Sequence, residues 1–137
     1  MNIINSDKKY HKKHSLVYSC QYHIIFCPKY RRKVLTDGID IRLKELIIEK
    51  QEEYGYSIIE MEIMPDHVHL LLDVDPKIGV HSATSKIKGY TSNILREEFK
   101  GLKSRLPCLW TRSKFISTVG TVSLETVKKY IEEQKGK

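Results

Sequence analysis

Apolar and polar residues alternate along two segments of the chain, which predicts two β-strands that each bury one face. The first segment is 17–26, and its apolar face carries Tyr18, Cys20, Tyr22, Ile24 and Phe26. The second segment is 67–74, and its apolar face carries Val68, Leu70, Leu72 and Val74. The opposite faces of both strands are more polar, with Ser19, Gln21 and His23 on the first and His67, His69 and Leu71 on the second.

Apolar residues at helical spacing predict three helices, and shorter apolar runs predict two further strands. The expected helices run from Asp37, as the cap, to about 54, from 80 to about 99 and from 124 to about 134, and the added strands are 56–63 and 114–119. Asp37 and Ser123 are expected to cap the first and last helices, and Gly55 is expected to stop the first.

The predicted order is β-α-β-β-α-β with one more helix at the C-terminus, which makes this an α+β chain. That order is typical of the ferredoxin-like or RRM-like antiparallel sheet, in which two helices cover one face and the first and third strands lie at the centre. We expect a single domain over 1–137, with a basic, flexible segment at 1–15 and a functional helix at 123–137.

Composition places the chain among soluble globular proteins. The 137 residues are 40% hydrophobic and 30% charged, and no apolar run approaches the length of a membrane span. Because the first residues also lack an apolar signal region, the expected compartment is the cytoplasm. The three cysteines show no metal-ligand spacing and are expected to be reduced, small hydrophobic side chains.

A net charge of +7 and a pI of about 9.3 indicate a polyanionic partner. One basic group surrounds Tyr10, and a solvated tail would explain it equally well. The second group follows the first strand and suits single-stranded nucleic acid, because its cations can follow phosphates while a ring stacks on a base. Its members are Lys29, Tyr30, Arg31, Arg32 and Lys33. Lys86, Lys88 and Arg96 are either phosphate contacts or a solvated helix face.

Two imidazoles, those of His67 and His69, project from the same face of one strand, close enough to share a metal ion. The pattern alone also allows two exposed histidines without a ligand. His23 lies on the corresponding face of the first strand and is a third ligand, a DNA contact or a surface histidine. Asp66 either orients an imidazole or simply forms the preceding turn.

Tyr130 and Gln134 are four residues apart and therefore share one face of the last helix. The helical pattern alone favours a packing role for this tyrosine. Gly120, shortly before the helix, is either a turn residue or a hinge.

Several motifs, in the same order, resemble those of the small HUH (histidine–hydrophobic–histidine) transposases of bacterial insertion sequences, the TnpA type. They are YHIIFCPKYR at 22–31, MPDHVHLL at 64–71 and KKYIEEQ at 128–134, with KIKG at 86–89 and LW at 109–110. The resemblance covers nearly the whole chain from Val17 onward.

The resemblance implies that His67 and His69 bind a divalent metal, Mg²⁺ or Mn²⁺, with Gln134 as third ligand when the helix is docked. It implies that Tyr130 is the nucleophile and forms a 5′-phosphotyrosine. It further implies a homodimer in which the helix can serve the partner's site, and a single-stranded DNA hairpin as substrate.

Two alternatives remain for a domain of this topology. The first is a non-catalytic RNA- or DNA-binding module that stacks bases on the open sheet. Because the open positions hold Gln21, His23, His67 and His69 in place of aromatic residues, the sequence favours catalysis. The second is a metal-dependent nuclease that uses water as its nucleophile.

Overall fold

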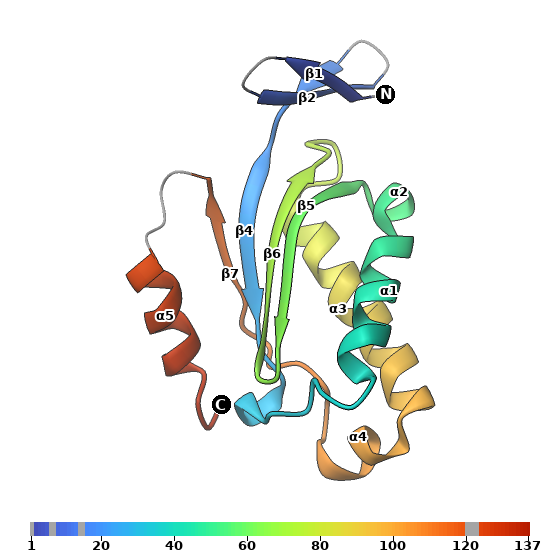
Figure 1. The fold of residues 1–137 in the computed structure, drawn as a ribbon, viewed down its shortest axis with the longest axis vertical. Coiled ribbons are helices and arrows are strands. Elements are labelled where there is room, and N and C mark those ends of the chain that lie inside the picture. Colours follow the sequence, from blue (N-terminus) through green and yellow to red (C-terminus); the bar gives the residue numbers. More distant parts are fainter. Residues whose placement is uncertain (1, 6–7, 14–15, 120–123) are drawn as a thin grey trace.

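Four antiparallel strands form the central sheet of the computed structural model, which describes residues 2–5, 8–13, 16–119 and 124–137. Their order across the sheet is β5-β6-β4-β7 (Figure 1). The strands are β4 (Gln21–Phe26), β5 (Tyr56–Met64), β6 (His67–Val74) and β7 (Phe115–Thr118). The predicted neighbours β4 and β6 pair at the centre, with Ile24 opposite Leu70.

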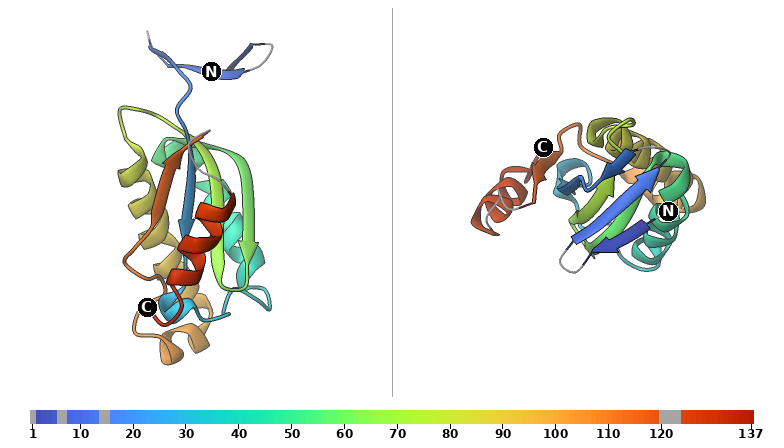
Figure 2. Two further views of the ribbon diagram at one scale, coloured as in Figure 1. Left: turned by 90° about the vertical axis from the view of Figure 1, so that its left-hand side faces the viewer. Right: turned by 90° about the horizontal axis from the view of Figure 1, so that it is seen from above.

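Two long helices cover one face of this sheet and a third lies on the other, as the side view in Figure 2 shows. Helices α1 (Ile39–Glu49) and α3 (Val80–Glu98) pack behind the strands, and α5 (Leu124–Glu133) lies in front of them. Shorter elements are the 3₁₀ turn η1 (Lys29–Arg31) and the helices α2 (Gln51–Tyr54) and α4 (Lys100–Arg105). The predicted β-α-β-β-α-β arrangement with a C-terminal helix is therefore confirmed.

The hydrophobic core lies between the sheet and helices α1 and α3. Ile24 and Phe26 from β4 and Leu70 from β6 are fully buried there. The helices contribute residues with the predicted spacing, among them Leu43, Leu46, Ile47, Ile87 and Leu95. The alternation of β6 is confirmed, because Val68, Leu70, Leu72 and Val74 all belong to this core.

The predicted strand at 17–26 is in fact two strands, β3 (Leu16–Tyr18) and β4. At the break, the backbone N–H of Cys20 donates to the Asp73 Oδ1 carboxylate oxygen at 2.9 Å. A side chain therefore takes the place of a ladder partner, and the chain changes direction between two sheets.

The N-terminal segment also differs from the prediction of irregular structure. Strands β1 (Asn2–Asn5) and β2 (Lys8–Lys13) pair antiparallel with each other, and β2 pairs with β3. Backbone pairing needs no alternation of apolar and polar residues, and this segment has none, so these strands could not be predicted from the pattern. The flexibility expected for 1–15 stays a prediction.

The predicted cap at Asp37 is wrong. Asp37 has a φ of 53°, and Gly38, with a φ of 95°, precedes the first turn of α1. The expected helix is also interrupted at Lys50, so that α2 is a separate short helix. Gly55 does stop it, as predicted: its φ is 75°, and a Cβ there would lie 2.2 Å from the Ile78 Cδ1 atom.

At the C-terminal end, the described part of α5 begins at Leu124, so the cap expected at Ser123 lies outside the described residues, as does Gly120. Within the described residues, no helix is both long and apolar enough to span a membrane.

Candidate active site

Strand β6 presents His67 and His69 on the face opposite the helix-covered core. His69 pairs with Glu62 on β5 and with Ile25 on β4, so these side chains share its face of the sheet. Both imidazoles are partly buried, in contrast to the fully buried Val68 between them. The predicted placement of the pair on the face away from α1 and α3 therefore agrees with the strand register.

One carboxylate orients His67. Its Nδ1 lies 2.9 Å from the Asp66 Oδ1 oxygen, and the side chains are only 16% and 17% exposed. An imidazole that donates from Nδ1 to a carboxylate presents the lone pair of Nε2 on its far side. Asp66 thus does more than form the turn, because its side chain fixes one ring nitrogen of His67.

His69 is held by a second histidine. Its Nε2 lies 3.1 Å from the Nδ1 of His23, and the ring centroids are 5.3 Å apart. Burial lowers the pKa of His69, and the nearby His23 lowers it further. The lowered pKa favours the neutral imidazole, which is the form that binds metals, and the contact with His69 shows that His23 is not an isolated surface residue.

Tyr130 comes from α5, the helix on the same side of the sheet as the imidazoles (Figure 2). The helix buries Val127, and the phenol ring of Tyr130 packs 5.3 Å from the Phe115 ring. The Tyr130 hydroxyl lies 2.9 Å from the Ser113 Oγ atom. Burial raises the pKa of Tyr130, and the hydrogen bond with Ser113 opposes that rise only in part.

Gln134 shares this serine. The Ser113 hydroxyl lies 2.7 Å from the Gln134 Oε1 oxygen, to which it can donate, and 2.9 Å from the Tyr130 hydroxyl, where either oxygen can be the donor. The amide nitrogen of Gln134 donates to the backbone oxygen of Tyr130 at 3.4 Å, and Gln134 is only 5% exposed. The predicted nucleophile and the predicted third ligand are thus held together by one hydroxyl.

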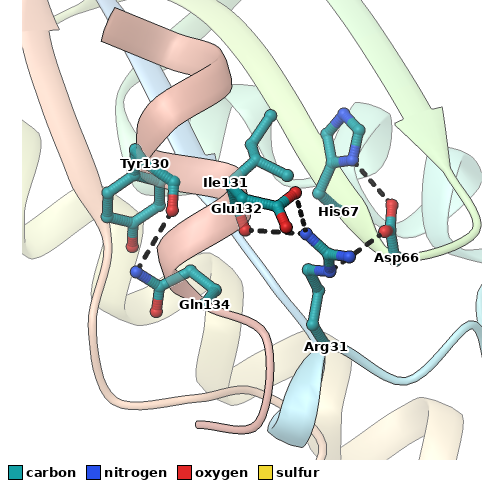
Figure 3. Close-up of polar contacts among 7 residues, drawn as sticks. All are labelled: Arg31, Asp66, His67, Tyr130, Ile131, Glu132 and Gln134. Carbon is teal, nitrogen blue, oxygen red and sulfur yellow. Dashed lines mark hydrogen bonds and ion pairs between the residues drawn. The ribbon is translucent and has the colours of Figure 1, made fainter.

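Arg31 connects the two halves of the site (Figure 3). On one side its Nε lies 3.3 Å from Asp66, and on the other its Nη1 donates to the backbone oxygen of Ile131 at 3.2 Å. Among the described residues, no hydrogen bond joins Tyr130 or Gln134 to either imidazole of β6. The structure therefore places the two groups on one side of the sheet, with no hydrogen bond between them among the described residues.

The residues predicted to contact DNA fall into two groups. Arg32 and Lys33 are exposed beside Tyr30, whose ring is 41% exposed with the Lys29 ammonium 5.2 Å from its centroid. These residues remain available to a ligand. Lys86 is also exposed, with its ammonium 5.8 Å from the Tyr54 ring.

Lys88 and Arg96, expected to be either phosphate contacts or part of a solvated face, form hydrogen bonds within the protein. The Lys88 ammonium donates to the backbone oxygens of Thr111 and Ser113, at 2.7 and 3.3 Å. Burial lowers its pKa to about 8, with the charge of Lys114 adding to the effect. Arg96 donates to the backbone oxygen of Leu106 at 3.4 Å, which ties α3 to the end of α4.

Two contacts of the site had no signal in the sequence. Ser113 lies in a loop with no motif around it, and its partners are 17 and 21 residues away. The basic residues around Arg31 predict a contact with DNA. They do not indicate its contact with the backbone oxygen of Ile131, 100 residues further along the chain. In the described residues no group of three or more His, Cys, Asp or Glu side chains is arranged to hold a metal ion.

Comparison with known proteins gives a consistent result. The sequence profile of the family described as "Transposase IS200 like" matches residues 16–134. The chain is 36% identical over 123 residues to the ISDra2 transposase TnpA of Deinococcus radiodurans, covering 88% of each chain. It is also 36% identical to the transposase for insertion sequence element IS200 of Salmonella typhimurium, covering 86% of this chain and 81% of the relative.

Solved structures share the fold. A crystal structure from Deinococcus radiodurans, described as a candidate transposase, superposes with a TM-score of 0.83 at 30% identity, covering 93% of this chain and 99% of that one. A REP-associated tyrosine transposase bound to a REP hairpin gives a TM-score of 0.56 at 13% identity, covering 95% of this chain and 69% of that one. The second likeness is one of fold alone.

Proposed function

The chain belongs to the family of IS200-like transposases, and from this premise we propose that it cleaves and rejoins single-stranded DNA through Tyr130 with the help of a divalent metal. The observation that supports the proposal most is the arrangement of β6 and α5. Two imidazoles on the open face of β6 lie on the same side of the sheet as the phenol that α5 provides.

The residues fit a metal site at His67 and His69. Asp66 holds Nδ1 of His67, and the pKa of His69 is lowered, so that each ring can offer a neutral nitrogen. A divalent ion bound there, Mg²⁺ or Mn²⁺, would act as a Lewis acid on a phosphate oxygen. Because the protein ligands are neutral, we expect the protein alone to bind such an ion weakly and DNA to strengthen the binding.

Tyr130 is proposed as the nucleophile. Its phenol oxygen attacks the phosphorus, the bond from phosphorus to the 3′ oxygen breaks, and the departing oxygen takes a proton to become a 3′-hydroxyl. The DNA is then joined to the protein as a 5′-phosphotyrosine. This linkage keeps the phosphodiester bond energy, so a 3′-hydroxyl can later reverse the step and rejoin a strand.

The described arrangement suits the resting state of such an enzyme. The phenol of Tyr130 is buried, its pKa is raised, and Ser113 holds it together with Gln134. Attack therefore requires α5 to move, or to serve the site of a second subunit. We propose a homodimer in which the helix can act on the partner's site, and in which Gln134 becomes a metal ligand once it leaves Ser113.

The proposed substrate is a single-stranded hairpin at a transposon end. The basic character of the chain and the exposed group of Tyr30, Arg32 and Lys33 support this choice. A hairpin substrate is also in keeping with the fold relative described as bound to a REP hairpin. We expect the reaction to take place in the cytoplasm.

Incubation with a single-stranded hairpin substrate and Mn²⁺ tests the proposal. Wild-type protein should form a covalent protein–DNA adduct that migrates slowly on a denaturing gel. Tyr130→Phe should cleave nothing and form no adduct, because it keeps the ring but lacks the attacking oxygen. Tyr54→Phe is the matched control, since its ring packs against Tyr90 away from the site, and it should behave as wild type.

Two other outcomes would support the alternative functions. Cleavage that persists in Tyr130→Phe, without an adduct, would indicate a nuclease that uses water. Binding of the hairpin with no cleavage by wild type under any divalent metal would indicate a non-catalytic module. Either result overturns the proposed function.

A further inference from the structure

We propose that Arg31 is a positioning residue that couples the docking of α5 to the orientation of His67. The inference rests on the proposed function, because it gives the arginine a role in assembling that site. It also assigns the guanidinium of Arg31 to contacts within the protein, whereas the basic neighbourhood alone indicated a DNA contact.

The backbone at Arg31 is held in an unusual conformation. Tyr30 and Arg31 have φ values of 62° and 51°, in the left-handed region that residues other than glycine rarely adopt. The turn is fixed by hydrogen bonds from the Lys29 N–H to the oxygen of Leu109, at 2.7 Å, and from the Arg31 N–H to the oxygen of Pro28, at 2.8 Å. This strained turn aims the Arg31 side chain across the end of the sheet, where Figure 3 shows it between Asp66 and α5.

On the sheet side, Arg31 contacts the carboxylate that orients His67. The Arg31 Nε lies 3.3 Å from the Asp66 Oδ2 oxygen, while the Asp66 Oδ1 oxygen lies 2.9 Å from His67 Nδ1. Each carboxylate oxygen therefore has one partner. The carboxylate is planar, so the contact with Arg31 fixes the orientation of the whole Asp66 carboxylate. The orientation of the carboxylate in turn sets the direction of its hydrogen bond with the His67 ring.

On the helix side, Arg31 contacts the last turn of α5. Its Nη1 donates to the backbone oxygen of Ile131 and to the Glu132 Oε2 oxygen, each at 3.2 Å. The Ile131 oxygen also accepts from the Gln134 N–H at 3.1 Å, and a cation is favourable at this end of a helix because of the helix dipole. The backbone N–H of Gly136 adds a longer contact of 3.5 Å to the oxygen of Tyr30.

The guanidinium can make both sets of contacts because it is planar and donates in several fixed directions, which a lysine ammonium on a flexible stem cannot reproduce. The Arg31 side chain is 14% exposed, so these contacts are only partly screened by solvent. If α5 leaves its place, Arg31 loses its helix partners and holds Asp66 less firmly. Conversely, anything that fixes Asp66 and His67 favours the docked helix, since coupling between two sites is reciprocal.

Hydrogen–deuterium exchange of the full-length protein measures this coupling without any need for catalysis. Arg31→Gln should speed amide exchange in α5 by roughly 5–50-fold, within the range typical of coupling between two sites. Arg31→Lys should restore only part of the protection. Arg32→Gln is the matched control, since Arg32 is the adjacent, exposed arginine, and it should leave α5 unchanged.

Asp66→Asn gives the decisive comparison, because among the described residues the Asp66 side chain forms polar contacts with Arg31 and His67 and none with α5. The proposal expects this variant to speed exchange in α5 as well, and expects the double variant with Arg31→Gln to lose less protection than the two single effects combined. In the other direction, Glu132→Gln should change the imidazole ¹⁵N shifts of His67, which a purely local role in helix packing would not move.

The melting temperature of each variant shows that the fold is retained, and Glu132→Gln, at an exposed carboxylate, is the mildest change. Unchanged exchange of α5 in Arg31→Gln, or in Asp66→Asn, would overturn the proposal. So would ¹⁵N shifts of His67 that do not respond to Glu132→Gln. These readouts are independent of the DNA adduct, so the coupling can stand or fail separately from the nucleophile assignment.

Discussion

The two faces of the central sheet are built from the same strands but held together differently. On the face covered by α1 and α3, Ile24, Phe26 and Leu70 are fully buried in a continuous apolar core. On the other face, His67, His69 and Tyr130 are only partly buried, and each has a specific polar partner. Because neighbouring residues of one strand serve both faces, the rigid core positions the polar groups of the site.

This difference between the two faces predicts that substitutions on one face mainly affect stability and substitutions on the other mainly affect cleavage. Apolar packing depends on volume and is shared among many neighbours, so a change in the core should affect stability more than chemistry. A polar contact depends on one or two atoms, so a change on the open face should affect chemistry more than stability. The following substitutions test this separation, from the largest expected effect to the smallest.

His69→Ala should have the largest effect, on the open face. We expect the rate of hairpin cleavage to fall by roughly 10³-fold, because the loss of a proposed metal ligand would remove several kcal/mol of charge stabilisation. The melting temperature should change little, since the side chain lies outside the apolar core. Gel-based cleavage rates and thermal melts measure the two effects. A large loss of stability with unchanged cleavage would remove the distinction between the faces.

Leu70→Ala, at the position next to His69, tests the covered face. The side chain is fully buried, and its truncation should lower the free energy of unfolding by about 2–5 kcal/mol. Urea unfolding followed by circular dichroism measures this loss. The protein that remains folded should cleave at nearly the wild-type rate, and a cleavage defect as large as that of His69→Ala would contradict the account.

Lys88→Met tests a contact that links the two faces. The Lys88 ammonium, from α3, donates to backbone oxygens of Thr111 and Ser113, just before β7. Its removal leaves these oxygens without their donor and should cost about 1–3 kcal/mol of stability. Lys86→Met is the matched control on the exposed side of the same helix and should be near neutral. Equal effects of the two changes would show that the buried contacts contribute nothing.

Ser113→Ala should have the smallest effect on stability, about 1 kcal/mol or less, because Ser113 is exposed. Its hydrogen bond lowers the pKa of Tyr130, while burial raises it, so its removal should raise that pKa further. A titration followed by ¹³C NMR of the Tyr130 ring measures the change. A lower pKa in the variant would show that Ser113 stabilises the neutral phenol, by accepting its hydrogen bond, more than it stabilises the phenolate.

The sequence predicted the parts of this molecule that depend on local periodicity. Alternation in 67–74 assigned Leu70 to the core and His69 to the open face, and the order of elements predicted the sheet topology. Both predictions succeed because burial acts on every second residue of a strand, so the pattern is visible within a few positions.

Contacts between distant polar residues could not be predicted in the same way. The partner of Arg31 on α5 is 100 residues away, and Ser113 meets Tyr130 through a loop that has no pattern of its own. Such pairs depend on how elements pack in space. The break at Lys50 and the turn at Asp37 were missed for a related reason, since backbone conformations there follow the packing of α1 and α2 and override the helical pattern.

Binding of Mn²⁺ to the full-length protein, followed by electron paramagnetic resonance, tests the central claim that His67 and His69 share one metal ion. The account predicts weak binding that hairpin DNA strengthens, and a loss of at least about tenfold in affinity in His67→Ala and in His69→Ala. His81→Ala, an exposed histidine of α3, should bind as wild type does. Wild-type affinity in both strand variants, with DNA present, would contradict the account.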